Sequence, residues 1–187
     1  MEKIAWREIE RKKKFESRVF NVSETLCAPP DEKTGPSRFT VIESKEWAVI
    51  IPVLDGDLGR EFLMVRQWRH GASRESLEFP GGVIEEGEEV EAGAKRELRE
   101  ETGFLALKFT KIAEVSPNPA IMSNRLHFFL AEDLIFDGEQ RLDEDEYVSV
   151  ERRREEEVFR DMGRPPYIHV FMAAALHFYR MSKESAL

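Results

Sequence analysis

The alternation of hydrophobic and polar positions predicts a central domain that mixes strands and helices. A continuous apolar run at residues 47–54 is typical of a buried strand, and residues 61–67 return after a short turn to complete a hairpin. Further strands are expected at about 105–115, 125–131 and 147–151, and helices at about 89–102, 153–162 and 167–181. Pattern alone therefore indicates a mixed α and β fold.

The first part of the chain, residues 1–44, has the pattern of a separate unit ahead of a main domain at residues 45–187. Strand-like composition at residues 19–22 and 38–42 is interrupted by a turn-rich segment at residues 28–36. Two short strands are too few to be stable alone. We therefore expect a small N-terminal antiparallel β appendage that packs on the main domain or on a partner chain.

Composition and charge narrow the class of protein. The 187 residues are 41% hydrophobic and 35% charged, which is ordinary for a globular chain, and the net charge of −9 argues against a broad nucleic-acid-binding surface. Cys27 stands alone, so no intrachain disulfide can form. No apolar run approaches the roughly 20 residues of a membrane span, and the charged N-terminus does not resemble a signal peptide. The expectation is a cytoplasmic protein that binds neither membrane nor nucleic acid.

Three glutamates on the helix predicted at residues 89–102 indicate chemistry. Glu97, Glu100 and Glu101 are spaced i, i+3 and i+4, which places their carboxylates on one helix face, where they repel one another. A divalent cation would compensate for this repulsion, and oxygen ligands favour Mg²⁺, Mn²⁺ or Ca²⁺. Taken alone, the cluster is more often a solvated acidic face, so the wider pattern has to decide.

That wider pattern resembles the Nudix box, the signature of hydrolases that act on a nucleoside diphosphate linked to another group. The matching positions are Gly82, Glu88, Arg96, Glu97, Leu98, Glu100, Glu101 and Gly103, followed by apolar Phe104. Five residues separate Gly82 from Glu88 and seven separate Glu88 from Arg96, as the box requires. The family usually has an aliphatic residue where Phe104 stands, and this departure affects packing rather than chemistry.

The resemblance implies a fold, a cofactor and a set of roles. The fold would be an α/β/α sandwich with a mixed sheet, and the cofactor would be Mg²⁺, with Mn²⁺ as an alternative. The resemblance makes Glu97, Glu100 and Glu101 metal ligands and catalytic groups, together with the backbone carbonyl of Gly82, whereas Glu88 and Arg96 would pair to brace the loop against the helix. Water would attack a phosphorus of the pyrophosphate, and the sequence does not say which glutamate serves as the base.

Residues before the box extend the resemblance to the ADP-ribose pyrophosphatase branch. This branch carries a Gln-aromatic-Arg segment, here residues 67–69, and a Glu-x-Pro-x-Gly approach to the box, here residues 78–82. By position, Arg69 would contact the diphosphate of the substrate and Glu78 would help to hold substrate or metal. The simpler alternatives are a surface arginine, and a glutamate paired with another protein group because an unpaired buried carboxylate is costly.

Two later segments bear on the substrate. Pro119 is typical of the ADP-ribose branch, but the surrounding residues 116–125 differ from its usual Ser-Pro-Gly segment. Within them, Arg125 and two asparagines either contact ligand or cap turns. In the acidic loop that follows, Glu144 or Glu146 matches the position of a mobile catalytic glutamate, although a solvated loop would look the same.

The sequence leaves several functions open. The branch forms homodimers in which the N-terminal sheet helps to enclose adenine, so we expect a homodimer that cleaves ADP-ribose to AMP and ribose 5-phosphate. A different nucleotide sugar, such as GDP-mannose or ADP-glucose, is the first alternative, because the box addresses only metal and phosphate. A ligand sensor without catalysis is the second alternative, and a purely structural carboxylate cluster is the third.

Overall fold

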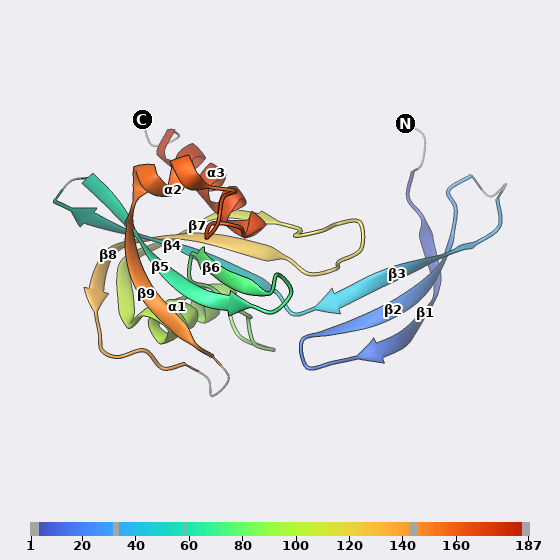
Figure 1. Ribbon diagram of the computed structural model, residues 1–187. Coiled ribbons are helices and arrows are strands. Elements are labelled where there is room, and N and C mark those ends of the chain that lie inside the picture. Colours follow the sequence, from blue (N-terminus) through green and yellow to red (C-terminus); the bar gives the residue numbers. More distant parts are fainter. Residues whose placement is uncertain (1–3, 32–33, 58, 143–145, 185–187) are drawn as a thin grey trace. The chain divides into compact units, whose positions relative to one another are not determined.

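The chain folds into two compact units in a computed structural model that describes residues 4–31, 34–57, 59–142 and 146–184 (Figure 1). The smaller unit joins two stretches that are distant in sequence, residues 1–45 and 116–125. The larger unit contains residues 46–115 and 126–187. Sequence patterning placed a boundary after residue 44 but did not connect residues 116–125 with the N-terminal strands.

The smaller unit is a three-stranded antiparallel sheet in the order β1-β2-β3, with bounds Arg7–Glu16, Phe20–Ala28 and Ser37–Ser44. The second stretch of the unit is held to β3 by backbone hydrogen bonds. The N–H of Ile42 donates to the carbonyl of Ile121 at 2.7 Å, and the N–H of Ser123 donates to the carbonyl of Ile42 at 3.1 Å. Strand β1 was not predicted, because its side chains are almost all charged and all exposed; backbone pairing with β2 defines it.

The larger unit is built on a six-stranded sheet in the order β6-β5-β4-β8-β7, with β9 also paired to β5. Strands β4 and β8 run parallel, and the other pairs are antiparallel, so the sheet is mixed. The strand bounds are Trp47–Gly56 for β4, Gly59–Arg69 for β5, Arg74–Glu78 for β6, Phe104–Val115 for β7, Leu126–Phe136 for β8 and Val148–Arg154 for β9.

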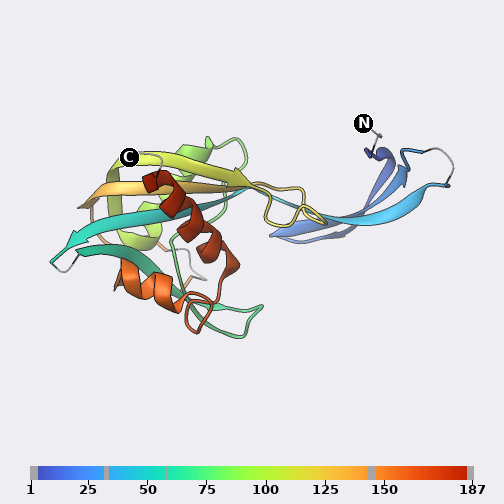
Figure 2. The same cartoon turned by 90° about the horizontal axis from the view of Figure 1, so that it is seen from above.

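Helices cover both faces of this sheet, as Figures 1 and 2 show. Successive residues of a strand point to opposite faces; Ala48 and Ile50 of β4 therefore pack with one cluster, and Val49 and Ile51 pack with the other. The first cluster includes residues of α1 and the second includes residues of α2 and α3. The helix bounds are Val90–Thr102 for α1, Glu155–Asp161 for α2 and Val170–Glu184 for α3. The predicted α/β/α sandwich with a mixed sheet is confirmed.

Several boundaries differ from those expected. Strand β9 continues to Arg154, and α2 begins only at Glu155, because Glu61 to Gln67 of β5 pair with β9 along its whole length. The charged residues of β9 carry no clear two-residue alternation, so the sequence suggested a helix from residue 153. Strand β6 was not predicted. Within the part of the chain that the structure describes, no helix combines the length and apolar character needed to cross a membrane.

Candidate active site on the glycine-rich loop and the first helix

Helix α1 carries the candidate site and has well-defined ends. The side chain of Glu89 accepts the N–H of Ala92 at 3.0 Å at the N-terminus. At the C-terminus, Gly103 adopts a left-handed conformation with φ of 73°, and its N–H donates to the carbonyl of Arg99 at 2.8 Å. Ala94 and Leu98 are buried against the sheet, which fixes the direction in which the glutamates of the helix point.

Glu101 is the most deeply buried of the box glutamates. It is 4% exposed, and its carboxylate accepts the backbone N–H of Gly81 at 2.8 Å. Burial raises the pKa of the Glu101 carboxyl to about 8, although the hydrogen bond from Gly81 acts in the opposite direction. The Glu101 carboxyl is therefore harder to ionise than an exposed glutamate unless a cation is near.

Glu97 lies one helical turn before Glu101 and faces the same loop. A Cβ atom added to Gly82 would lie 2.5 Å from a carboxylate oxygen of Glu97, so a larger residue here would displace the Glu97 carboxylate. Burial raises the pKa of Glu97 to about 7; Arg96 opposes this shift, and the negative charge of Glu100 adds to it. Two neighbouring carboxyl groups thus share an environment that favours either protons or a cation.

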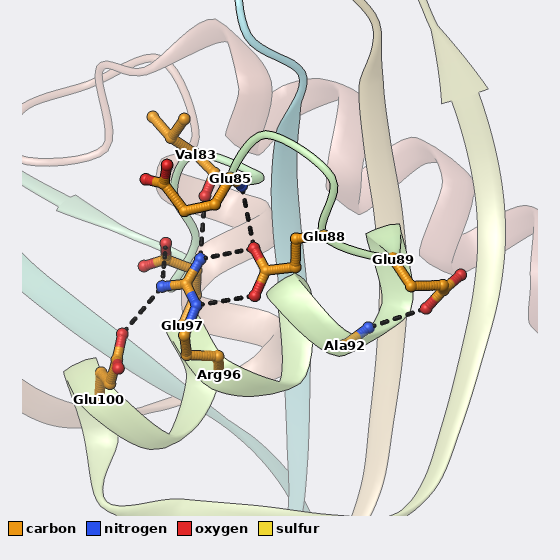
Figure 3. Close-up of polar contacts among 8 residues, drawn as sticks. All are labelled: Val83, Glu85, Glu88, Glu89, Ala92, Arg96, Glu97 and Glu100. Carbon is orange, nitrogen blue, oxygen red and sulfur yellow. Dashed lines mark hydrogen bonds and ion pairs between the residues drawn. The ribbon is translucent and has the colours of Figure 1, made fainter.

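Arg96 is the centre of the polar contacts that join the loop to the helix (Figure 3). Its guanidinium binds both carboxylate oxygens of Glu88, at 2.9 and 3.0 Å, and donates to the carbonyl of Val83 at 3.1 Å. The same guanidinium contacts Glu97 and Glu100, each at 2.9 Å. The structure therefore places Glu88 and Arg96 in the predicted pair, and it also shows Arg96 neutralising two of the predicted metal ligands.

The loop that faces the helix is fixed to strand β4. The N–H of Ala48 donates to the carbonyl of Gly82 at 2.9 Å, and the N–H of Ile50 donates to the carbonyl of Pro80 at 2.9 Å. A Cβ at Gly81 would lie 2.2 Å from the carbonyl oxygen of Ala48, so no larger residue fits. The Gly82 carbonyl oxygen keeps a second lone pair beyond its bond to Ala48, as a metal ligand would need.

Arg69 and Glu78 form a bidentate ion pair near these carboxylates. The two guanidinium–carboxylate distances are 2.9 and 2.5 Å. Burial would raise the pKa of Glu78, which is 4% exposed, but the guanidinium of Arg69 outweighs it and the pKa is lowered. Glu78 is thus a charged, paired carboxylate, in contrast to Glu97 and Glu101. The guanidinium of Arg69 also interacts electrostatically with Glu101.

The acidic loop before β9 contributes Glu146 to the site. Besides burial, which is the largest cause, the negative charge of Glu146 contributes to the raised pKa of both Glu97 and Glu101, and this charge also acts on Arg69. The structure therefore places Glu146 close enough for its charge to act on these residues. Glu144, the other predicted candidate in this loop, lies outside the described residues.

The loop is tied to the end of α1 by contacts that sequence reasoning missed. The side-chain amide of Gln140 donates to the carbonyl of Glu101 at 2.5 Å, and the N–H of Arg141 donates to the carbonyl of Glu100 at 2.8 Å. Arg99 pairs with Asp137 at 2.6 Å. No local pattern marks Gln140, because its role arises only when the loop folds back onto the helix end.

Other predicted residues lie elsewhere or have structural partners. Arg125 belongs to the smaller unit, so its predicted contact with substrate stays a prediction. In the same unit, the side-chain amide of Asn124 donates to the carbonyl of Lys45 at 3.1 Å and links two distant stretches of the chain, whereas the main-chain carbonyl of Asn118 accepts the N–H of Met122 at 2.8 Å. His169 was not predicted; its Nε2 lies 4.0 Å from a carboxylate oxygen of Glu78.

The candidate metal ligands do not surround a single point in this structure. Among the described residues, no three His, Cys, Asp or Glu side chains converge closely enough to form a ready-made metal cage. Arg96 draws Glu100 and Glu97 toward itself, whereas Glu101 turns to Gly81. These contacts turn the carboxylates toward different partners, so the candidate donors share one helix face but do not converge on one point.

The family model for the NUDIX domain matches residues 44–173. The match covers most of the chain, and the chain therefore belongs to the NUDIX domain family. The family interpretation drawn from the box residues is confirmed by this match.

Curated relatives match a shorter part of the chain. It is 44% identical over 91 residues to the ADP-ribose pyrophosphatase of Bacillus subtilis (strain 168), covering 48% of this chain and 49% of the relative. It is 33% identical over 91 residues to the ADP compounds hydrolase NudE of Escherichia coli (strain K12), covering 49% and 47%. For the ADP-sugar pyrophosphatase of Mus musculus, identity is 43% over 76 residues, covering 40% and 33%. The chain thus spans about half the length of these relatives, or less.

A solved structure supports the fold. The crystal structure of an ADP compounds hydrolase is similar to this chain with a TM-score of 0.80 and 23% identity, covering 97% of this chain and 95% of that chain. The similarity extends over both units of the protein, and at this identity it bears on fold alone.

Proposed function

We propose that the protein is a divalent-metal-dependent pyrophosphohydrolase that cleaves ADP-ribose to AMP and ribose 5-phosphate. The observation that carries the proposal is a pair of glutamates, the buried Glu101 and the partly buried Glu97, held against the Gly81–Gly82 loop and under the electrostatic influence of Arg69 and Glu146. Buried carboxyl groups whose pKa is raised by burial need a cation to become charged. The diphosphate of a substrate is also negatively charged, and a bound cation would offset that charge as well.

The residues present fit Mg²⁺, with Mn²⁺ as an alternative. All candidate donors are oxygens, from Glu97, Glu100, Glu101 and the carbonyl of Gly82, and hard divalent cations prefer such ligands. When bound, the cation would supply charge neutralisation for the pyrophosphate and lower the pKa of a bound water. To reach it, Glu97 and Glu100 would have to share or release their contacts with Arg96.

The remaining charged residues suggest how substrate is oriented. Arg69, paired with Glu78, presents a guanidinium next to the carboxylates, and guanidinium groups bind phosphate oxygens in a bidentate manner. Glu146 is an exposed carboxylate close enough to influence Glu97 and Glu101, which suits a group that accepts a proton from attacking water. Water adds its oxygen to one phosphorus as the bridging P–O bond breaks, and the products are two phosphate monoesters.

The names of the relatives support an ADP-containing substrate. One is named an ADP-ribose pyrophosphatase, another an ADP compounds hydrolase, and a third an ADP-sugar pyrophosphatase. They share the ADP moiety and differ in what is attached to it. ADP-ribose therefore remains the proposed substrate. A comparison with ADP-glucose tests which sugar the protein prefers. The predicted homodimer also remains a proposal.

The decisive experiment compares two glutamate substitutions on the same helix. Glu101→Gln removes a buried carboxylate, whereas Glu91→Gln changes an exposed carboxylate that pairs only with Lys95 among the contacts seen here. With Mg²⁺ and ADP-ribose, we expect AMP release to fall by about 100-fold or more for Glu101→Gln, because several kcal/mol of charge stabilisation are lost. Glu91→Gln should retain the activity of the unaltered protein.

A substrate panel completes the test. ADP-glucose, GDP-mannose and nucleoside triphosphates are compared with ADP-ribose at equal concentration, and kcat/KM ranks them. A faster reaction with another nucleotide sugar would reject ADP-ribose and keep the pyrophosphohydrolase chemistry. Binding of ADP-ribose without turnover at any divalent metal would favour the ligand sensor instead.

A further inference from the structure

His169 directly precedes helix α3 and lies beside the paired carboxylate of Glu78. Its Nε2 atom lies 4.0 Å from a carboxylate oxygen of Glu78, whose side chain is 5% exposed. The side chain of His169 is 26% exposed, so most of the ring is enclosed by the protein. His169 belongs neither to the box nor to the segments before it, and the proposed function assigns it no role.

The segment that carries this histidine is fixed along strand β6. The residues on either side of Glu78 each donate their backbone N–H to it. The N–H of Leu77 donates to the carbonyl of Pro166 at 3.0 Å, and the N–H of Phe79 donates to the sulfur of Met172 at 2.9 Å. Contacts before and after the histidine therefore hold its ring next to Glu78.

The tautomer of the His169 ring follows from the contact of its other nitrogen. Nδ1 accepts the N–H of Phe171 at 3.1 Å, so in the neutral ring the proton is on Nε2. Burial is the largest influence on the pKa of His169 and lowers it from the ordinary value of 6.5, although the negative charge of Glu78 acts in the opposite direction. The neutral ring thus has its N–H donor on the nitrogen that lies near Glu78.

Glu78 can accept a further hydrogen bond. Its two carboxylate oxygens accept Nε and Nη2 of Arg69, at 2.9 and 2.5 Å, and an ionised carboxylate has about four acceptor positions. The remaining N–H groups of the guanidinium are the ones that could bind a phosphate. A phosphate bound there would share the positive charge of Arg69 with Glu78 and would repel the Glu78 carboxylate. Another donor to Glu78 would offset both effects.

The contact between His169 and Glu78 is too long for a hydrogen bond in the free protein. A shift of roughly 1 Å would bring the two atoms within range, and hydrogen bonds at active sites often shorten only when substrate is bound. We propose that His169 is a positioning residue that donates from Nε2 to Glu78 when a diphosphate binds, and so keeps Arg69 oriented toward the phosphate oxygens. The inference rests on the proposed function for the identity of the anion.

Two substitutions separate the roles of the two ring nitrogens. In His169→Asn the side-chain amide extends about as far as Nδ1, so it can still accept the N–H at the start of α3, but it does not reach Glu78. In His169→Gln the amide extends about as far as Nε2, so it keeps a donor near Glu78 and loses the contact at the helix start. The control is His177→Asn, because His177 is exposed on the same helix.

Calorimetry in the presence of Mg²⁺ measures the affinity of the full chain for α,β-methylene-ADP, whose diphosphate cannot be cleaved at the bridge. We expect His169→Asn to weaken binding by about tenfold, because a hydrogen bond to a charged group is lost. His169→Gln and His177→Asn should bind as the unaltered protein does. In urea without ligand the order should reverse, with a lower midpoint for His169→Gln and an unchanged midpoint for His169→Asn. A purely structural role would change stability and affinity together.

Hydrolysis of ADP-ribose separates the failure of this inference from failure of the proposed function. His169→Asn should raise the KM by about tenfold and leave kcat nearly unchanged, because the lost bond supports substrate and transition state alike. Unchanged affinity and KM in His169→Asn, or equal losses in His169→Asn and His169→Gln, would overturn the role of His169 alone if ADP-ribose is still cleaved. Weaker binding of α,β-methylene-ADP to His169→Asn only, without cleavage of ADP-ribose by the unaltered protein, would support the role of His169 and reject the proposed function.

Discussion

Burial of acidic groups determines the properties of the site at the residue scale. Glu101 is almost completely removed from water and the side chain of Glu97 is 14% exposed, yet both face a polar loop rather than hydrocarbon. Such groups are costly to ionise unless a positive charge is near. Protons and divalent cations should therefore compete for the same two carboxyl groups, and each bound cation should displace protons.

The metal-free protein should lose stability as the pH rises from about 5 to 8. Burial raises the folded-state pKa of Glu97 to about 7 and of Glu101 to about 8, from the ordinary value of 4.5. Between these values the folded state holds more protons than the unfolded state, so the free energy of unfolding declines with pH. Glu101→Gln should reduce this decline and be more stable than the unaltered protein at pH 8, by on the order of a few kcal/mol.

Urea denaturation in the presence of a chelator, at pH 5, 6.5 and 8, measures this effect. Glu91→Gln serves as the control, because its exposed carboxylate should leave the pH dependence unchanged. Parallel pH profiles for Glu101→Gln and the unaltered protein would show that Glu101 is ionised in the folded state throughout this range.

The residue types of the site were predictable, but their individual environments were not. Spacing placed Glu97, Glu100 and Glu101 on one helix face, yet only the packing of α1 shows that Glu101 is buried while Glu100 remains partly exposed. Gln140 had no recognisable signal, because its partners are main-chain carbonyls at a helix end. Burial and main-chain contacts depend on tertiary structure, which a short sequence pattern does not contain.

The strand, loop and helix of the site act as one unit at the element scale. Strand β4 holds the loop through main-chain hydrogen bonds, and Arg96 holds the loop to α1 through Glu88 and Val83. The same guanidinium offsets the repulsion between Glu97 and Glu100. One side chain thus maintains both the shape and the charge balance of the loop and helix.

Arg96→Met should destabilise the metal-free protein by about 1–3 kcal/mol, because it leaves partly buried carboxylates without a partner while preserving much of the side-chain volume. The loss of stability should be smaller than for a fully buried ion pair, since the side chain of Arg96 is 31% exposed and solvent screens its charge. The matched control is Lys95→Met, whose pair with Glu91 is exposed and should contribute about 0.5 kcal/mol or less.

Chelator-treated samples of both variants, unfolded with urea at pH 6, provide the comparison. Equal losses for Arg96→Met and Lys95→Met would contradict a central role for Arg96.

Elements with strong periodicity were predictable, and those defined by pairing were not. The apolar run of β4 and the capped helix α1 were expected close to their observed positions. Strand β1 and the end of β9 consist mainly of charged residues, and they are strands because β2 and β5 offer them unpaired backbone groups. These partner strands are distant in the sequence, so the local pattern does not indicate them.

One mixed sheet organises the larger unit at the scale of the whole molecule. Its two faces carry separate hydrophobic clusters, and the candidate site belongs to the face covered by α1. The sheet was predictable because its central strands are apolar on both faces. The composition of the smaller unit was not, since it combines residues 1–45 with residues 116–125.

That combination has a consequence for how the chain can be altered or can evolve. The connection between β7 and β8 binds the backbone of Ile42 through Ile121 and Ser123, so the N-terminal strands and this connection form one inherited module in two pieces. A chimera that exchanges only residues 1–45 with a relative should express poorly or be digested early by protease, whereas one that also exchanges residues 116–125 should resist. The two pieces are expected to change together over evolutionary time, although some 70 residues of the other unit separate them in the gene.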